Sequence, residues 1–325
     1  MPLLRRQFLQ IAAGAVALPA VSRVSWAETY PSQPVRVIVG FAAGGPNDIL
    51  ARLIGQWLAK RLGHPFVIEN RPGAGSNIAT EAVVRASPDG YTLLLVGSPN
   101  AINATLYERL NFDFLRDIAP VASCMRGALV LVLHPSVPAK TLPEFIAYAK
   151  ANPDKLSYGS GGVGGITHIT AELFKMMAGI DMVHVPYRGI APALTDLLGG
   201  RVQALFANPA QSIPYTGAGR LRALAITTAS RSEALPDIPA VSEFVPGYEA
   251  SSIFGFGAPK DTPAEIIDRL NKEIAAVVAE PEVKARIAAL DGTVLVGSPA
   301  DFGKVMAEET EKWGKVIHAA NIKTE

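Results

Sequence analysis

Two glycine-rich loops are the segments of this chain whose residue types most directly suggest chemistry. Residues 40–48 (GFAAGGPND) follow an apolar, strand-like run at 35–39, and residues 159–168 (GSGGVGGITH) follow a second run at 156–158. Each loop leads into a helical pattern. The N-terminus of a helix has backbone N–H groups without intrahelical partners, and glycines let a ligand approach the backbone closely. One such loop in each half of the chain predicts a site that holds both ends of a small anion.

Other helix starts in the sequence carry their own caps. Residues 141–144, 262–265 and 298–301 each begin with Ser or Thr and end with an acid, so a hydroxyl and a carboxylate can occupy the free N–H groups. The helix that starts at residues 165–168 has no acid before Glu172. We therefore expect its N–H donors to be available to a ligand.

Asp48 is the one acid inside the first loop, and its residue type leaves two roles open. As a helix cap or loop staple it would occupy N–H donors and compete with an anion. As a ligand contact it would face an amino or hydroxyl group, or hold a water molecule.

Polar residues after other strand-like runs supply candidate walls for the site. Residues 70–77, 97–100 and 206–209 are such loops. In open parallel sheets ligands bind beyond the carboxyl ends of the strands, so these loops should converge. The predicted ligand-binding residues are Phe41, Ala42, Ala43, Gly44, Gly45, Asn47, Asp48, Ser76, Asn77, Ser98, Ser160, Gly162, Gly164, Thr167, His168 and Asn208.

No catalytic or metal-binding pattern accompanies these loops. The five histidines are scattered without an H-E-x-x-H motif, and neither loop is followed by the Lys-Ser or Lys-Thr of a phosphate-binding P-loop. His168 lies at a helix start, which disfavours its protonated form, and we interpret it as a neutral donor or structural residue. We therefore expect no enzyme, no catalytic residue, no metal and no cofactor.

An exported oxidoreductase is the alternative interpretation. Residues 159–164 match the dinucleotide pattern G-x-G-x-x-G. The strand-like run that follows, at 182–187, ends in Pro-Tyr-Arg and lacks the acid that would bind a ribose, which weakens this interpretation.

Strand and helix patterns alternate along the chain and predict an α/β protein with parallel sheets. Strand-like runs at 35–39, 66–69 and 92–96 enclose helices at 49–62 and 78–86, and a second series begins after the long apolar run at 128–133. We expect two parallel-sheet lobes joined by two crossover segments, near 124–133 and 222–228. Lobe 1 would comprise residues 28–124 plus 228–325, and lobe 2 residues 125–227.

Residues 1–27 have the features of an export signal peptide. Arg5-Arg6 begins it in the twin-arginine manner, an apolar run spans 11–21, and Ser25-Trp26-Ala27 suits signal peptidase. The chain carries 30 Lys and Arg against 29 Asp and Glu, so its charges nearly balance. The sequence contains no basic tract of the kind that binds nucleic acid. Its single cysteine, Cys124, excludes an internal disulfide. We expect a periplasmic protein, exported by the twin-arginine route.

Ordered motifs along the chain resemble those of one family. They are residues 41–48 (FAAGGPND), 67–75 (VIENRPGAG), 88–93 (PDGYTL), 184–189 (HVPYRG), 196–200 (DLLGG) and 221–225 (LRALA). Together they are similar to the Bug-type solute-binding receptors of tripartite tricarboxylate transporters. Many members have Pro-Gly-Gly where this chain has Ala43-Gly44-Gly45, which restores one N–H group at residue 43.

The resemblance implies a bilobal type II periplasmic-binding-protein fold that closes over a ligand. It also implies a receptor that captures a small carboxylate (a di- or tricarboxylate, an acidic amino acid or an aromatic acid) and delivers it to the membrane subunits of a tripartite transporter. Residues 41–48 and 160–168 correspond to the family's binding loops. We expect a monomer that contacts the ligand and these transporter subunits.

Overall fold

The computed structural model describes residues 30–153 and 155–324. Residues Gln33–Glu325 form one compact unit. The predicted signal peptide lies outside the described residues. Within the described part of the chain, no helix combines the length and the apolar character that crossing a membrane requires.

The first sheet has six strands in the order β11-β4-β10-β3-β1-β2. As predicted, β1 (Val35–Val39) pairs in parallel with β2 (Phe66–Asn70) and β3 (Thr92–Gly97). The pairings of β10 (Ser252–Pro259) with β3 and with β4 (Ile118–Gly127) are antiparallel, as is that of β11 (Gly292–Val294) with β4.

The second sheet has five strands in the order β7-β6-β8-β5-β9. Its parallel part consists of β6 (Ser157–Ser160), β7 (Val183–Pro186) and β8 (Ala204–Ala207), and β5 (Val130–Leu133) runs antiparallel to β8 and to β9 (Arg222–Ile226). Both sheets therefore contain antiparallel strands that the expectation of two parallel-sheet lobes did not include. Each of these antiparallel pairings involves β4, β5, β9 or β10, the strands that lie directly before or after the segments that pass between the sheets.

The chain passes between the sheets twice, through residues 128–129 (the first crossover) and residues 227–251 (the second crossover). The two crossovers are joined where Leu129 N–H donates to Thr227 Oγ1 over 3.0 Å and Thr227 N–H donates to the carbonyl of Leu129 over 2.9 Å. Strand β4 of the first sheet ends at Gly127. The predicted lobe limits at residues 124 and 228 remain a prediction.

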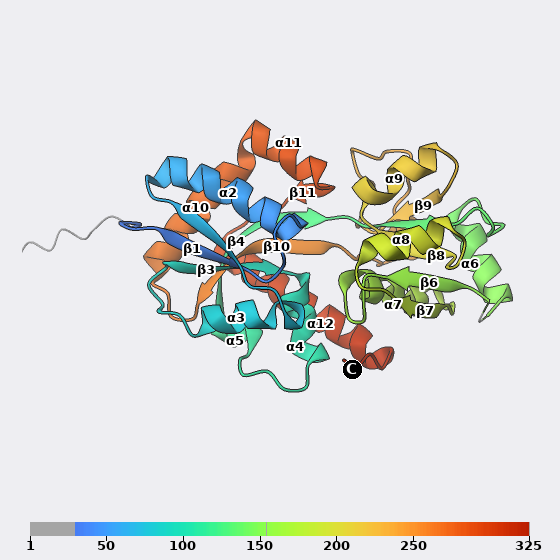
Figure 1. Ribbon diagram of the computed structural model, residues 1–325, viewed down its shortest axis with the longest axis horizontal. Helices are drawn as coiled ribbons and strands as arrows, with labels where there is room; N and C mark the ends of the chain where they lie inside the picture. The colour runs from blue at the N-terminus through green and yellow to red at the C-terminus, as the bar shows by residue number, and fades with distance from the viewer. Residues whose placement is uncertain (1–29, 154, 325) are drawn as a thin grey trace, which may run out of the picture. The chain divides into compact units, whose positions relative to one another are not determined.

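Helices cover both faces of each sheet (Figure 1). On the first sheet, α2 and α10 pack on the face opposite α3 and α4. On the second, α8 and α9 share one apolar cluster, and α6 and α7 share another. The helices are α2 (Pro46–Leu62), α3 (Asn77–Val84), α4 (Ser98–Leu106), α5 (Phe114–Asp117), α6 (Leu142–Ala151), α7 (Ile166–Ala178), α8 (Ile190–Leu198), α9 (Pro209–Gly217), α10 (Ala264–Ala279), α11 (Pro281–Ala289) and α12 (Pro299–Ala319), with short 3₁₀ turns at Ala74–Ser76 and Val241–Glu243.

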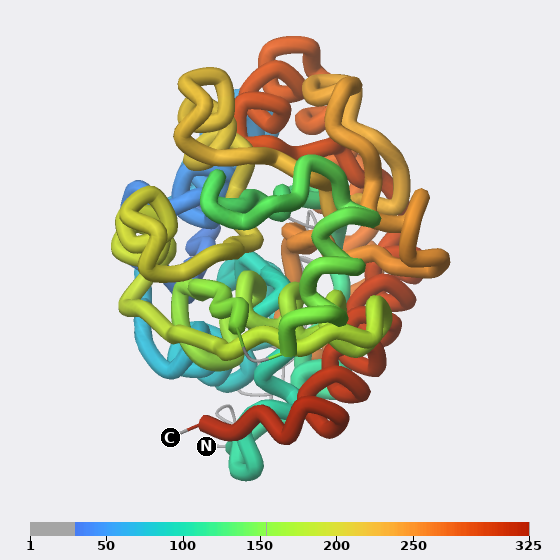
Figure 2. The backbone as a smooth tube through the Cα atoms, turned by 90° about the vertical axis from the view of Figure 1, so that its right-hand side faces the viewer, coloured from blue at the N-terminus to red at the C-terminus, as the bar shows by residue number. Residues whose placement is uncertain are grey.

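The long helix α12 connects the cores of the two sheets. It packs against α4 and β4 of the first sheet and also reaches α7 of the second, and Figure 2 shows it in red along the molecule. Its Trp313 is fully buried, and the apolar cluster that contains Trp313 includes Leu94 of the first sheet and Phe206 of the second. The apolar residues of the two sheets therefore form one continuous core.

Two of the three predicted helix caps are confirmed. The hydroxyl of Thr141 accepts from Glu144 N–H, and Ser298 and Asp301 exchange hydrogen bonds at the start of α12. The third prediction, that Thr262 caps α10, is wrong. The hydroxyl of Thr262 donates to the carbonyl of Pro259 over 2.7 Å, so it is turned away from α10.

Candidate functional site

A cavity of about 290 Å³ lies where the starts of five helices meet strands β4 and β10. The helices α2, α4, α7, α8 and α9 follow β1, β3, β6, β7 and β8, so they begin at the carboxyl ends of the parallel strands. The lining residues are Phe41, Pro46, Asn47, Ser98, Pro99, Met125, Gly127, Ala128, Gly161, Gly165, Ile166, Thr167, Gly189, Ile190, Asn208, Ser252, Phe254 and Leu290.

At each of the five helices that begin at the cavity, the N-cap residue itself does not cap the helix with its side chain, as far as the described residues extend. Their N-cap residues are glycine or asparagine, and in the described chain none of these five makes a side-chain cap hydrogen bond. By contrast, the side chains of Asp113, Thr141 and Ser298 cap α5, α6 and α12. Two of the five starts meet a side-chain acceptor from another residue: Gly97 N–H at α4 donates to Asn100 Oδ1 over 2.8 Å, and Ala210 N–H at α9 donates to Asp291 Oδ2 over 2.6 Å. Each of the five starts contributes a partial positive charge. Five of them around one cavity make a site suited to an anion.

The cavity combines these starts with an apolar wall. Of the described residues that line it, none is Asp, Glu, Lys, Arg or His. Phe41, Phe254, Met125 and Leu290 supply large apolar surfaces. An anion in this cavity would therefore be bound by backbone N–H, hydroxyl and amide groups, and a ligand ammonium group would find no carboxylate in the lining.

Two lining hydroxyl groups each accept one hydrogen bond from a backbone N–H group. Ser98 Oγ accepts from Ile253 N–H, and Thr167 Oγ1 accepts from Gly161 N–H, each over 2.9 Å. Neither hydroxyl donates a hydrogen bond to another described residue, so the proton of each is available to a ligand. Carboxylate oxygens accept such bonds, and ammonium groups do not.

Five predicted residues line the cavity: Phe41, Asn47, Ser98, Thr167 and Asn208. In the part of the chain that the structure describes, the other predicted residues lie outside this lining. They are Ala42, Ala43, Gly44, Gly45, Asp48, Ser76, Asn77, Ser160, Gly162, Gly164 and His168.

Asp48 holds the first glycine-rich loop together. Its side chain is buried and accepts from Gly44 N–H (2.9 Å), Arg52 Nε (3.0 Å) and Asn70 Nδ2 (3.0 Å). Asn70 also donates to the carbonyl of Phe41, which lines the cavity. These bonds, that from Arg52 first, lower the pKa of Asp48 from 3.8 to about 2. Of the two roles that the sequence left open, this arrangement is that of a loop staple.

The second loop is also held by internal hydrogen bonds. Gly162 N–H donates to Ser160 Oγ over 3.2 Å, and Gly164 N–H donates to His168 Nδ1 over 3.0 Å. Gly161 N–H donates to Thr167 Oγ1. The expectation that the N–H donors of the helix start at 165–168 are available is wrong for Gly165 and His168, which donate to the carbonyls of Gly162 and Gly165 over 3.2 and 3.0 Å. The N–H groups left without intrahelical partners are those of the first positions of α7, at Ile166 and Thr167.

The side chains of two stacked histidines form hydrogen bonds with this loop. The rings of His168 and His184 lie 3.8 Å apart, and His184 Nε2 is 2.7 Å from Ser160 Oγ. Burial lowers the pKa of His168 to about 3 and that of His184 to about 4. Both rings are therefore neutral at ordinary pH, as the sequence interpretation of His168 requires.

Ser76 and Asn77 lie behind the first loop at the start of α3. Both are buried, and Asn77 Oδ1 accepts from Asn103 Nδ2 over 2.9 Å. Ser76 Oγ and Asn77 Nδ2 have no hydrogen-bond partner among the described residues. Ser76 adopts a left-handed conformation with φ of 81°, and a side chain at Gly40 would collide with it.

Sequence reasoning missed the wall that comes from the antiparallel strands. Met125, Gly127, Ser252 and Phe254 belong to β4 and β10, and Leu290 precedes β11. These residues carry no loop signature. Only the topology of the crossovers brings them to the cavity. Gly189 ends the motif HVPYRG, and this glycine was the available signal for the start of α8.

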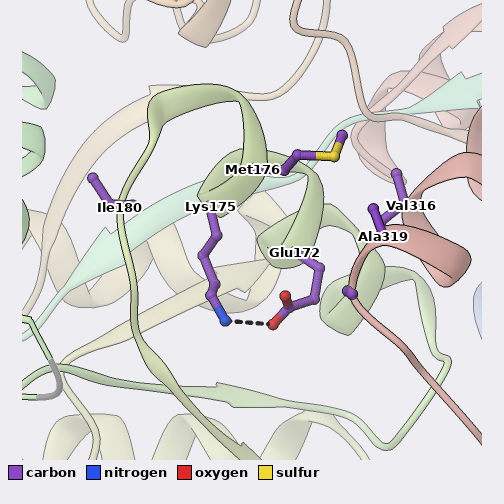
Figure 3. Close-up of a pocket in the computed structure, with 7 residues that line it drawn as sticks. Glu172, Lys175, Met176, Ile180, Val316 and Ala319 are labelled. Carbon is purple, nitrogen blue, oxygen red and sulfur yellow. Dashed lines mark hydrogen bonds and ion pairs between the residues drawn. The ribbon is translucent and has the colours of Figure 1, made fainter.

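A second cavity of about 260 Å³ lies between α7 and the end of α12 (Figure 3). Glu172 and Lys175 form an ion pair of 2.9 Å in its wall, and Met176 and Val316 contribute apolar surface. Because its two charges neutralise each other, this cavity lacks the anion-binding character of the first. The described residues contain no group of three or more His, Cys, Asp or Glu side chains that could hold a metal ion.

Two sheets joined by two crossovers, with an anion-suited cavity at the strand ends, define the class of solute-binding proteins. A family model described as TctC, tripartite tricarboxylate transporter family receptor, matches residues 50–322. The chain therefore belongs to the receptors of the tripartite tricarboxylate transporter family. The receptors of this family are periplasmic solute-binding proteins, and the resemblance seen in the sequence motifs is confirmed.

Known relatives agree with this assignment. Protein BugT of Bordetella pertussis is 35% identical over 316 residues, which cover 96% of this chain and 95% of BugT. The structure described as R. palustris Rpa4515 with adipate is 37% identical with a TM-score of 0.78, covering 90% of this chain and 99% of that one. MatC of Rhodopseudomonas palustris, with bound malate, is 30% identical with a TM-score of 0.74, covering 89% and 100%. These likenesses confirm the periplasmic-binding-protein fold.

Proposed function

We propose that this protein is a receptor without catalytic activity, which binds a small carboxylate in the 290 Å³ cavity and delivers it to the membrane subunits of a tripartite transporter. The observation that carries the proposal is the meeting of five helix starts around a lining without charged side chains; in the described chain, the N-cap residues of these helices make no side-chain cap hydrogen bond. Relatives with bound adipate and malate support the ligand class.

The proposed binding mode uses two ends of the cavity. One carboxylate accepts N–H bonds from the first loop and the start of α2, near Phe41 and Asn47. The other accepts from Ile166 and Thr167 at the start of α7, where the Gly161, Gly162 and Gly164 donors are already used. Ser98 and Asn208 contribute further donors from the sides. The protein acts as a monomer in this proposal.

The lining favours one ligand subclass. Apolar surface from Phe41, Phe254 and Leu290 suits a hydrocarbon body, and the absence of Asp and Glu from the described lining leaves an ammonium group unpaired. We therefore expect an aliphatic dicarboxylate to bind more tightly than an acidic amino acid of the same length.

A thermal-shift screen on the purified chain from residue 28 tests the proposal. The panel is adipate, malate, citrate, glutamate, benzoate and NAD⁺. A ligand at ~100 times its Kd stabilises the folded state by ~2.7 kcal/mol, which raises Tm by several degrees. We expect a dicarboxylate to give this shift. A shift with NAD⁺ and none with any carboxylate would reject the receptor and favour an oxidoreductase.

A hydroxyl deletion locates the ligand in this cavity. Thr167→Val keeps the shape of the side chain but removes the donor, and we expect the Kd to rise about tenfold. The matched control is Thr195→Val on α8, whose hydroxyl donates to the carbonyl of Ala191 and which lies outside the lining. Equal Kd values for the two variants would place the ligand elsewhere.

A further inference from the structure

One carboxylate connects the two sheets next to the cavity. Asp291 lies between α11 and β11, at the edge of the first sheet, and its Oδ2 accepts from Ala210 N–H over 2.6 Å. Ala210 is in the first turn of α9, which follows β8 of the second sheet. The bond therefore joins residues of different sheets that are 81 positions apart.

The start of α9 needs this partner. Its N-cap residue, Asn208, makes no side-chain cap bond within the described chain, and Pro209 has no N–H group. Ala210 carries the first N–H group of the helix, while Gln211 N–H already turns back to the carbonyl of Asn208. A carboxylate at this position satisfies an unpaired donor and interacts favourably with the helix dipole. Asp291 thus caps α9 from the other sheet.

The backbone of Asp291 is held in place. Its N–H donates to the carbonyl of Ala288 over 2.9 Å, and its carbonyl accepts from Ala128 N–H over 3.1 Å. Its φ of 58° lies in the left-handed region, which Asp and Asn tolerate better than other residues with side chains. The carboxylate is therefore presented to α9 by a fixed backbone rather than by a flexible loop.

The bond lies directly behind the cavity wall. Asp291 is outside the cavity lining, but three residues near it are part of that lining. They are its chain neighbour Leu290, Ala128, whose N–H donates to the carbonyl of Asp291, and Asn208, the N-cap residue of α9. Partial burial raises the pKa of Asp291, which is consistent with a carboxylate withdrawn from solvent. Separation of the sheets at this edge would break the bond between Asp291 and Ala210 and displace Leu290 from Asn208.

We infer that Asp291 is a latch: a positioning residue that holds α9 against the first sheet and so retains a ligand in the cavity. The role in retention rests on the proposed function. The latch also satisfies the dipole of α9 from within the protein, so the ligand's carboxylates are left to the starts of the other four helices. Removing the latch should therefore speed ligand release and leave ligand capture almost unchanged.

Hydrogen exchange on the ligand-free protein tests the latch itself. We expect the Ala210 amide to exchange about tenfold faster in Asp291→Ala and Asp291→Gly, which both remove the side-chain acceptor, than in the wild type. Glycine adopts the left-handed backbone without steric strain, so the second variant remains informative if the alanine variant unfolds. The matched control is Asp301→Asn, which removes an exposed carboxylate cap at the start of α12. Unchanged exchange at Ala210 in a folded Asp291 variant would overturn the latch.

Stopped-flow release of the best dicarboxylate from the screen tests its function. We expect the dissociation rate constant of Asp291→Gly to rise about tenfold while the association rate constant stays within about twofold. An unchanged dissociation rate constant would overturn the role in retention. If the wild type bound no carboxylate, the proposed function would fail and retention with it, whereas the exchange experiment would still decide whether Asp291 caps α9.

Discussion

At Asp48, one carboxylate organises the first loop of the site. It accepts bonds from Gly44, Arg52 and Asn70, and the last of these also binds the carbonyl of Phe41. The residue type alone left a cap and a ligand contact as equal alternatives. What decided between them is the position of Asn70, which reaches the loop only because β1 and β2 pair in register at Val39 and Asn70.

We expect Asp48→Asn to destabilise the protein by about 1–3 kcal/mol at pH 7, because it weakens the charge-assisted bonds that the buried Asp48 carboxylate accepts. The pKa of Asp48 is lowered on folding, so its contribution is fully present above about pH 4 and is lost as the pH falls towards about 2. Urea unfolding of both proteins at pH 7 and at pH 2.5 measures this. A stability difference as large at the lower pH as at pH 7 would contradict it.

The histidine pair predicts a second pH dependence. The pKa values of His168 and His184 are lowered by burial, so the unfolded chain binds protons that the folded chain does not. Stability should therefore fall as the pH drops from about 6.5 towards 4. His168→Asn retains an acceptor for Gly164 N–H but cannot be protonated, and should show a shallower fall. His318→Asn, at an exposed position of α12, is the control, and an equal slope in both variants would refute the assignment.

At the scale of the elements, the site depends on which helices lack an acid in their first turn. The starts of α7, α8 and α9 have none, and α2 has only Asp48, which is engaged by its own loop. This contrast was visible in the sequence at the start of α7. The prediction from this contrast was incomplete, because three side chains of the second loop accept hydrogen bonds from the loop's own N–H groups. These side chains are Ser160, Thr167 and His168.

An acid added to one of these starts should weaken anion binding. Ala191→Asp places a carboxylate in the first turn of α8 at an exposed position, and we expect the ligand Kd to rise about two- to fivefold, more at low ionic strength. Thr195→Asp adds the same charge to the same helix beyond its first turn. The helix-start account predicts a smaller effect there, and calorimetric Kd values that rise equally would contradict it.

At the scale of the whole molecule, the second loop lies against the first sheet's helix α4. A Cβ atom on Gly164 would lie 2.2 Å from Leu106 Cδ2, so only glycine permits this approach. Gly164 also has a φ of 71°, which would strain any side chain there. The contact joins the two halves of the site.

Gly164→Ala should therefore weaken ligand binding by more than tenfold. The control Gly179→Ala shares the positive φ, at 62°, but meets no atom within 4 Å. Both variants should lose about 1 kcal/mol or more of stability through backbone strain, and only Gly164→Ala should also lose affinity. Thermal unfolding and titration calorimetry separate the two effects. Equal affinities would mean that the approach of the loop to α4 does not matter for binding.

Much of this architecture could be predicted from the sequence. The alternating patterns predicted the parallel strands of each sheet, which are β1, β2 and β3 in the first and β6, β7 and β8 in the second. The motifs predicted the family. Both predictions are confirmed. The antiparallel strands were not predicted, because hydrophobic runs such as 128–133 carry no information on direction or partner. Phe254, Leu290 and the latch at Asp291 were missed for the same reason: their roles depend on contacts between residues far apart in the chain.

Titration calorimetry with a dicarboxylate and its esters tests the central claim most directly. The claim is that both carboxylates are held by helix starts, because the described residues of the cavity lining include no charged side chain. For adipate, monomethyl adipate and dimethyl adipate, or the same series of whichever diacid stabilises the protein most, the account predicts that each lost charge raises the Kd at least about tenfold. A diester that binds as tightly as the diacid would contradict it.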